Sequence, residues 1–132
     1  MIVESGSGSR HRRCYDGTTF YAEYINHFEK EKNYEDVIRQ FQLIDKHLKD
    51  GNTHLLYHGW DEKRECFWAD KETGRSANFW GRSVGWYCCA LVDTLDWLKE
   101  DADGTMLIEK VKDLAEALVK VQSEKSGVWY HS

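Results

Sequence analysis

Two short segments hold most of the residues that could act on a ligand. They are Tyr57-His58-Gly59-Trp60-Asp61 and Phe79-Trp80-Gly81-Arg82-Ser83-Val84-Gly85-Trp86. Tryptophan rings can stack on the C–H faces of a pyranose, while arginine and histidine can pair with a carboxylate. The glycines between them let the backbone approach a ligand closely. The two segments therefore favour a binding site for an acidic sugar.

The composition is typical of one globular domain. The chain has 132 residues, of which 41% are hydrophobic and 31% are charged, so it can bury a core and is not expected to be disordered. A net charge of −5 argues against general nucleic-acid binding, and no apolar run reaches the length of a membrane span. Residues 1–13 are polar and end in a basic cluster, which predicts a flexible tail or linker before an ordered region over 14–132.

The cysteines give no sign of a metal site. They lie at positions 14, 66, 88 and 89, without the Cys-X-X-Cys spacing of structural zinc sites. Reduced thiols in a cytoplasmic protein are expected, and the lack of an apolar signal segment at the N-terminus points the same way. We expect neither a metal nor a cofactor.

Apolar spacing predicts four helices and no long strand. The expected ranges are about 18–30, 33–48, 82–99 and a segment that follows 103–105, with Asn33 as a candidate cap. The first helix should carry an aromatic face, made by Phe20, Tyr21, Tyr24, Ile25 and Phe28. The last should bury one side, made by Leu107, Ile108, Val111, Leu114, Ala115, Leu118 and Val119. The stretch 51–81 should be a long ordered loop, and such loops are usually functional.

A weak internal repeat supports a modular helical fold. The segment from Leu43 to His58 and the segment from Leu114 to His131 both read as a helix end, a polar turn and an apolar stretch that ends in Tyr-His. Tyr57 and Tyr130 are 73 positions apart, about the length of two helices with their loops.

Several separate motifs carry a resemblance to a known family. They are Asp16-Gly17, Ala22-Glu23-Tyr24, Leu56-Tyr57-His58-Gly59-Trp60-Asp61-Glu62, Trp68-Ala69-Asp70-Lys71-Glu72-Thr73-Gly74, Phe79-Trp80-Gly81-Arg82, Gly85-Trp86-Tyr87, Ala90-Leu91-Val92-Asp93 and Gly127-Val128-Trp129-Tyr130. With these motifs, residues 16–131 resemble the unsaturated rhamnogalacturonyl hydrolases of glycoside hydrolase family 105, which are related to the unsaturated glucuronyl hydrolases. Asp16 precedes Ala22 by six positions, fewer than is usual in that family.

The resemblance implies an all-α fold and a carbohydrate substrate. The family fold is an (α/α)6 barrel of six α-hairpins, so residues 14–132 would be part of such a glycosidase barrel and would supply about four helices of the twelve. An open arc of such a barrel would expose apolar helix faces, so self-association through these faces is also expected. Family members are hydrolases that act on Δ4,5-unsaturated uronyl disaccharides from pectin or rhamnogalacturonan and release the unsaturated galacturonate from rhamnose.

The resemblance also assigns roles to residues. The family's reaction is a vinyl-ether hydration, in which a carboxylic acid protonates C4 and water is captured at C5. Asp16 matches the catalytic acid and base. His58, Trp80, Arg82 and Trp86 match substrate-binding positions, and Asp61 would orient His58 or Arg82 or serve as a reserve acid. Trp60 and Trp68 are expected to pack in the core or the loop.

Structural roles for the same residues stay open. Asp16-Gly17 could be a turn with a helix cap, His58 a hydrogen-bonded loop residue, and Arg82 a salt-bridge partner at a helix start. The tryptophans could belong to the core. The alternative function is accordingly a non-catalytic helical remnant, or an interaction module with a sugar-binding tryptophan platform.

Overall fold

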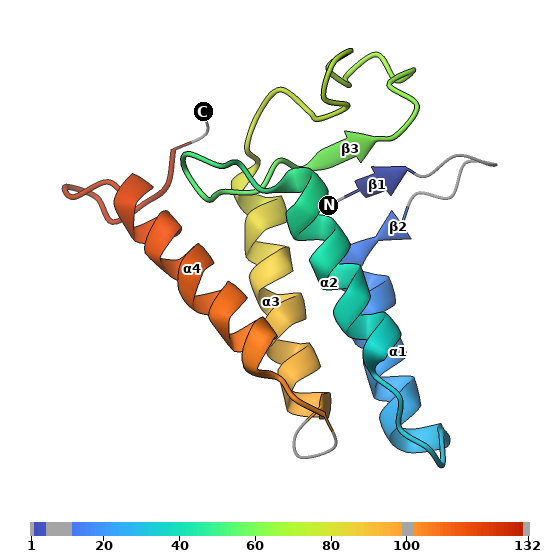
Figure 1. Ribbon diagram of the computed structural model, residues 1–132. Coiled ribbons are helices and arrows are strands. Elements are labelled where there is room, and N and C mark those ends of the chain that lie inside the picture. Colours follow the sequence, from blue (N-terminus) through green and yellow to red (C-terminus); the bar gives the residue numbers. More distant parts are fainter. Residues whose placement is uncertain (1, 5–11, 99–101, 131–132) are drawn as a thin grey trace.

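Four amphipathic helices follow one another along the chain. They are α1 (Cys14–Phe28), α2 (Glu35–Leu48), α3 (Gly81–Leu98) and α4 (Thr105–Val121). The computed structural model describes residues 2–4, 12–98 and 102–130, and in it α3 lies between the first hairpin, α1 and α2, and the outer helix α4 (Figure 1). The expected all-α class is confirmed. Among these residues, no helix combines the length and the apolar character needed to cross a membrane.

Local hydrogen bonds explain where α2 and α4 begin. The Asn33 side-chain oxygen accepts from the Glu35 N–H at 2.9 Å, and the Asp103 carboxylate accepts from the Thr105 N–H at 2.9 Å. Such bonds satisfy N–H groups that have no partner inside the helix. The first helix begins at Cys14, earlier than expected, because the preceding strand runs into it directly.

The helices bury one shared apolar core. On α2 the buried positions follow the helical period, at Val37, Phe41, Ile44 and Leu48. The aromatic face expected on α1 is not the face that is buried. Ala22 and Ile25 are buried, whereas Phe20, Tyr24 and Phe28 are exposed. On α4, Ile108 and Val119 are exposed as well, which corrects the expected core face. Periodicity identifies the apolar residues of a helix, but what covers them depends on the neighbouring elements.

A small sheet was not expected from the sequence. Its strands are β1 (Ile2–Glu4), β2 (Arg12–Arg13) and β3 (Gly59–Asp61), in the order β2-β1-β3. The central strand β1 pairs antiparallel with β2 and parallel with β3. Strands of two or three residues are too short to show an alternating pattern. The backbones of 2–4 and 12–13 therefore differ from the expected tail, whereas positions 1 and 5–11 lie outside the described residues.

One turn geometry occurs three times in the loops that the structure describes. In each case residue i donates its N–H to the carbonyl of residue i+5, and residue i+4 donates to the carbonyl of residue i. Residue i+4 has a positive φ each time, at His54, Gly74 and Gly127. The three turns are Asp50–Leu55, Asp70–Arg75 and Ser123–Val128. Two of them follow the ends of α2 and α4, which confirms the repeat at this level.

Candidate active site

Three segments that could form a site meet at one end of the bundle. The sheet register places Arg13, Ile2 and Gly59 in one row, so the start of α1 lies two strand spacings, about 10 Å, from the 57–61 segment. A bridge between Tyr57 and Phe79 then brings the start of α3 to the same segment. Figure 1 shows the strands at the end of the bundle where α1 and α3 begin. The residues singled out in the sequence therefore come from elements that converge.

His58 is fixed by one hydrogen bond. Its Nδ1 lies 2.9 Å from the carbonyl oxygen of Asn78. Because a carbonyl only accepts, Nδ1 carries the proton, and in the neutral ring Nε2 is an acceptor. The ring lies edge-on to Trp80, with 6.2 Å between centroids and an interplanar angle of 84°. The bond thus orients the imidazole beside the Trp80 indole.

Arg82 lies over the same indole. Its guanidinium carbon is 4.5 Å from the Trp80 ring centroid, and both side chains are exposed. This distance is that of a cation–π contact. We refer to His58, Trp80 and Arg82 as the His-Trp-Arg cluster. It combines a flat apolar ring with a fixed positive charge and an oriented imidazole, which is the chemistry needed to hold an anionic sugar.

Trp86 is on α3, four residues after Arg82. Residues at this spacing are neighbours on a helix surface, and the Trp86 side chain is exposed. The structure thus brings Trp86 to the face that carries Arg82.

Asp16 is the third residue of α1. Its backbone is placed by the sheet row described above, since β2 ends at Arg13 and α1 begins at Cys14. Its side chain lies outside what the structure describes. Its assignment as catalytic acid therefore stays a prediction.

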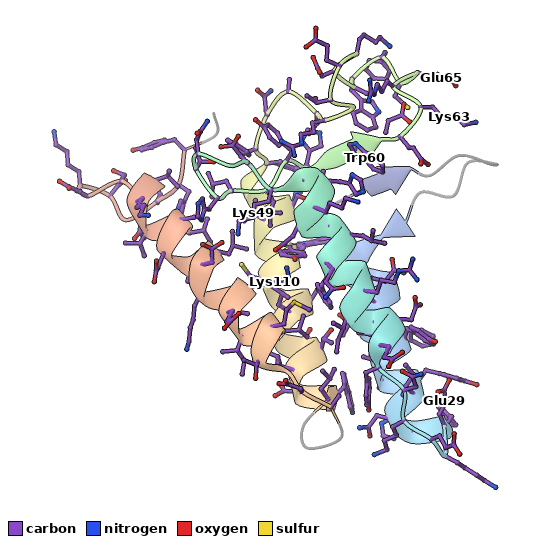
Figure 2. The ribbon with its side chains drawn as sticks, in the orientation of Figure 1. Glu29, Lys49, Trp60, Lys63, Glu65 and Lys110 are labelled. Atoms are coloured by element: carbon purple, nitrogen blue, oxygen red, sulfur yellow. The ribbon has the colours of Figure 1, made fainter. Side chains whose placement is uncertain are left out.

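Asp61 is a buried loop anchor. Its carboxylate accepts hydrogen bonds from the N–H groups of Lys63, Glu65 and Cys66 at 3.0, 2.8 and 2.9 Å. These bonds, chiefly the one from Cys66, hold the pKa of Asp61 below its ordinary value, although burial opposes them. In Figure 2, Lys63 and Glu65 lie on the loop beyond β3. A carboxyl with a lowered pKa is poorly suited to keep a proton near neutral pH, so the geometry favours a structural role.

Further residues hold the loop in place beneath the cluster. A Cβ at Gly59 would lie 3.0 Å from the Trp68 ring, so the ring covers this backbone directly. Trp60 stacks on His47 with 3.7 Å between centroids, and its indole N–H donates to the Thr73 carbonyl at 3.1 Å. The expectation that Trp60 and Trp68 serve packing is confirmed.

Two supporting contacts were missed at the sequence level. Arg75 donates from Nε to the His47 carbonyl at 2.7 Å and lies over the Tyr57 ring at 5.6 Å. The Asn78 carbonyl that orients His58 is a backbone group. Residue types cannot indicate either contact, because both depend on how the loop folds back. Within the described residues, no group of three His, Cys, Asp or Glu side chains could hold a metal ion.

The sequence of this chain is similar to those of known glycoside hydrolases. The sequence profile of Glycosyl Hydrolase Family 88 matches residues 14–132. Protein Atu3128 of Agrobacterium fabrum is 34% identical over 113 residues, which cover 86% of this chain and 48% of that protein. The unsaturated rhamnogalacturonyl hydrolase YesR of Bacillus subtilis is 33% identical over 103 residues, which cover 77% of this chain and 28% of YesR.

A solved structure has the same arrangement. A family 105 glycoside hydrolase of C. acetobutylicum superposes with a TM-score of 0.83 at 45% identity, over 89% of this chain and 33% of that chain. These similarities confirm the resemblance to family 105. The chain spans about half of the length of Atu3128 and about a third of the solved relative.

Proposed function

Because the chain belongs to Glycosyl Hydrolase Family 88, we propose that it carries the sugar-acid site of a hydrolase for Δ4,5-unsaturated uronyl disaccharides. The observation that supports this most is the His-Trp-Arg cluster, in which a guanidinium and an oriented imidazole both contact one indole. The name of the relative YesR supports rhamnogalacturonan as the source of the substrate, with rhamnose next to the unsaturated galacturonate.

In this proposal the cluster binds the uronate. Arg82 pairs with the carboxylate, because a guanidinium offers several N–H donors to its two oxygens. Trp80 and Trp86 stack on the sugar and exclude water, which strengthens the charge pairing. His58 presents Nε2 to a ring hydroxyl, since its Nδ1 is already bonded to the Asn78 carbonyl. The small carbohydrate is the only ligand that the proposal requires.

Asp16 supplies the chemistry. Its carboxyl donates a proton to C4 of the C4=C5 double bond, and positive charge develops at C5 and the ring oxygen. Water adds to C5 and returns a proton to the Asp16 carboxylate, which restores the acid. The hemiketal then opens as the bond from C5 to the ring oxygen breaks, and the neighbouring sugar leaves while C1 becomes an aldehyde.

Two aspartates of the chain can be told apart by this requirement. The acid must still hold a proton near neutral pH, which burial or a second carboxylate would favour. Asp61 is buried, but three N–H groups stabilise its ionised form and outweigh the effect of burial on its pKa. Asp16 is therefore the residue to test first.

The test measures turnover and binding on the same preparation. Turnover is followed as the loss of ultraviolet absorbance of the unsaturated uronate, and binding as a rise in unfolding temperature with the disaccharide. We expect Asp16→Asn to lower kcat at least about 100-fold while binding persists, because general acid catalysis contributes factors of this size. Asp36→Asn is the matched control, an exposed acid in the first turn of α2.

A second variant tests the cluster itself. Arg82→Gln should raise KM and remove the ligand-induced rise in unfolding temperature, because the carboxylate loses its charged partner. A folded chain that shows neither turnover nor stabilisation by the disaccharide would refute the proposal and favour the non-catalytic helical remnant.

A further inference from the structure

The segment that follows the long loop runs back antiparallel beside β3. Trp60 of β3 pairs with Arg75. The next step joins Gly59 and Ser76, because Ser76 donates its N–H to the Gly59 carbonyl at 2.9 Å. Up to this point, one residue of β3 faces one residue of the returning segment, as in a regular antiparallel pair of strands.

This regular pairing is interrupted beside His58. The next pair along the two segments is Tyr57 with Phe79. The single residue His58 therefore faces two residues, Ala77 and Asn78. Two residues opposite one residue are the pattern of a β-bulge, a feature that re-aims groups and is common next to active sites. The bulge places the Asn78 carbonyl 2.9 Å from Nδ1 of His58, so the orientation of the His58 ring depends on it.

Ser76 holds the two segments together at the residue before the bulge. In a regular pair, the Gly59 N–H would donate to the Ser76 carbonyl. It donates instead to the Ser76 side-chain oxygen at 3.2 Å. Ser76 is buried, with 3% of its surface exposed, and Gly59 is buried as well. The hydroxyl thus takes the place of the backbone acceptor, which releases the Ser76 carbonyl from the pairing and lets the chain enter the bulge.

We propose that Ser76 is a positioning residue for His58. Its hydroxyl accepts from the Gly59 N–H, the chain then enters the bulge, and the bulge brings the Asn78 carbonyl to the His58 ring. The ring proton is thereby held on Nδ1, and Nε2 remains an acceptor. Serine suits this task because its short side chain can bond to nearby backbone groups. The effect on binding rests on the proposed function, in which Nε2 of His58 meets a sugar hydroxyl.

The direct test measures the tautomer of His58 without any ligand. Nitrogen-15 NMR of the histidine rings, recorded above the ordinary pKa of histidine, distinguishes a proton on Nδ1 from a proton on Nε2. The signals of His58 are those that disappear in His58→Gln. Ser76→Ala removes the acceptor, and Ser76→Cys keeps a similar volume but offers only a weak acceptor. Circular dichroism checks that each variant keeps its helix content.

The matched control is Thr94→Val. It also removes a buried hydroxyl, but the Thr94 hydroxyl has no hydrogen-bond partner among the residues that the structure describes. Thr94 follows Arg82 by twelve positions on α3, a distance of about 18 Å along the helix. The control therefore separates the role of the Ser76 hydroxyl from the general effect of a core substitution.

We expect the wild type and Thr94→Val to carry the His58 proton on Nδ1. Ser76→Ala should raise the ratio of the Nε2–H to the Nδ1–H form at least about tenfold, which corresponds to the loss of one hydrogen bond. Ser76→Cys should change the ratio in the same direction by a smaller factor. A wild type with the proton on Nε2, or a folded Ser76 variant with the ratio of the wild type, would overturn the proposal.

Binding of the unsaturated disaccharide separates this inference from the proposed function. Followed by tryptophan fluorescence, the Kd of Ser76→Ala should be about tenfold higher than that of the wild type, because His58 loses its fixed orientation and its acceptor nitrogen. Equal affinities despite a changed tautomer would overturn the link from Ser76 to binding. A wild type that does not bind the disaccharide would count against the proposed function, whereas the tautomer measurement would still decide the role of Ser76.

Discussion

Replacing Asp61 by alanine should destabilise the loop that supports the proposed site. The carboxylate accepts three backbone hydrogen bonds, from Lys63, Glu65 and Cys66, within 3.0 Å. Alanine leaves these three N–H groups without their acceptor in a region where Asp61 itself is buried. The loss should therefore exceed that of an ordinary surface substitution.

The size of the effect follows from the number of bonds. A net contribution of about 1 kcal/mol for each bond gives a loss of about 3 kcal/mol in the free energy of unfolding. For a domain of this size, that corresponds to a fall in unfolding temperature on the order of 10 °C. Asp61→Asn should cost less, because the amide oxygen still accepts.

The assay is urea unfolding followed by tryptophan fluorescence. The matched control is Asp70→Ala, because Asp70 also accepts from two N–H groups and a hydroxyl in a short turn but is exposed. Water can replace its bonds, so its loss should be much smaller. Equal losses for Asp61→Ala and Asp70→Ala would contradict the reasoning.

The pH dependence gives an independent check. The pKa of Asp61 is lowered from its ordinary value of 3.8, so its ionised form stabilises the fold above that pH. This contribution is lost as the pH falls through the lower pKa of the folded state. The stability difference between wild type and Asp61→Asn should therefore shrink below about pH 4. A stability difference that stays constant down to acidic pH would show that the charge of Asp61 does not stabilise the fold.

Three further substitutions test other features of the fold. Gly74→Ala should cost at least about 2 kcal/mol in urea unfolding, because φ is +76° and the new Cβ would collide with the Asp61 carbonyl oxygen. Gly127→Ala should cost only about 1 kcal/mol, since its φ of +68° is similar but nothing lies within 4 Å; equal costs would contradict this account. Asp113→Asn should lower the thermal stability at pH 7. Burial alone would raise the pKa of Asp113, but the hydrogen bonds and charges of Lys49 and His54 together outweigh it and lower that pKa. The stability difference between wild type and Asp113→Asn should narrow as the pH falls below about 4, because the carboxylate becomes protonated. A stability difference that widens at acidic pH would contradict a stabilising role for the charge of Asp113.

The sequence by itself determined the helices and the residues of the cluster. Helical periodicity identified four helices whose ranges agree closely with the structure for α2, α3 and α4. It could do so because the buried stripe of a helix and its capping residues are local features. The clustering of His58, Trp80 and Arg82 in two short segments also indicated a sugar-acid site before any geometry was known.

Only the tertiary structure decided which apolar faces are covered and what each polar group does. Phe20 and Phe28 fit a core pattern but are exposed, because burial depends on a neighbour that periodicity cannot specify. Asp61 fits a catalytic pattern, yet it accepts three N–H bonds that form only when its loop folds back. The sheet that brings the start of α1 to the 57–61 segment could not be predicted from the sequence either, because β1 pairs with a strand far away in the chain.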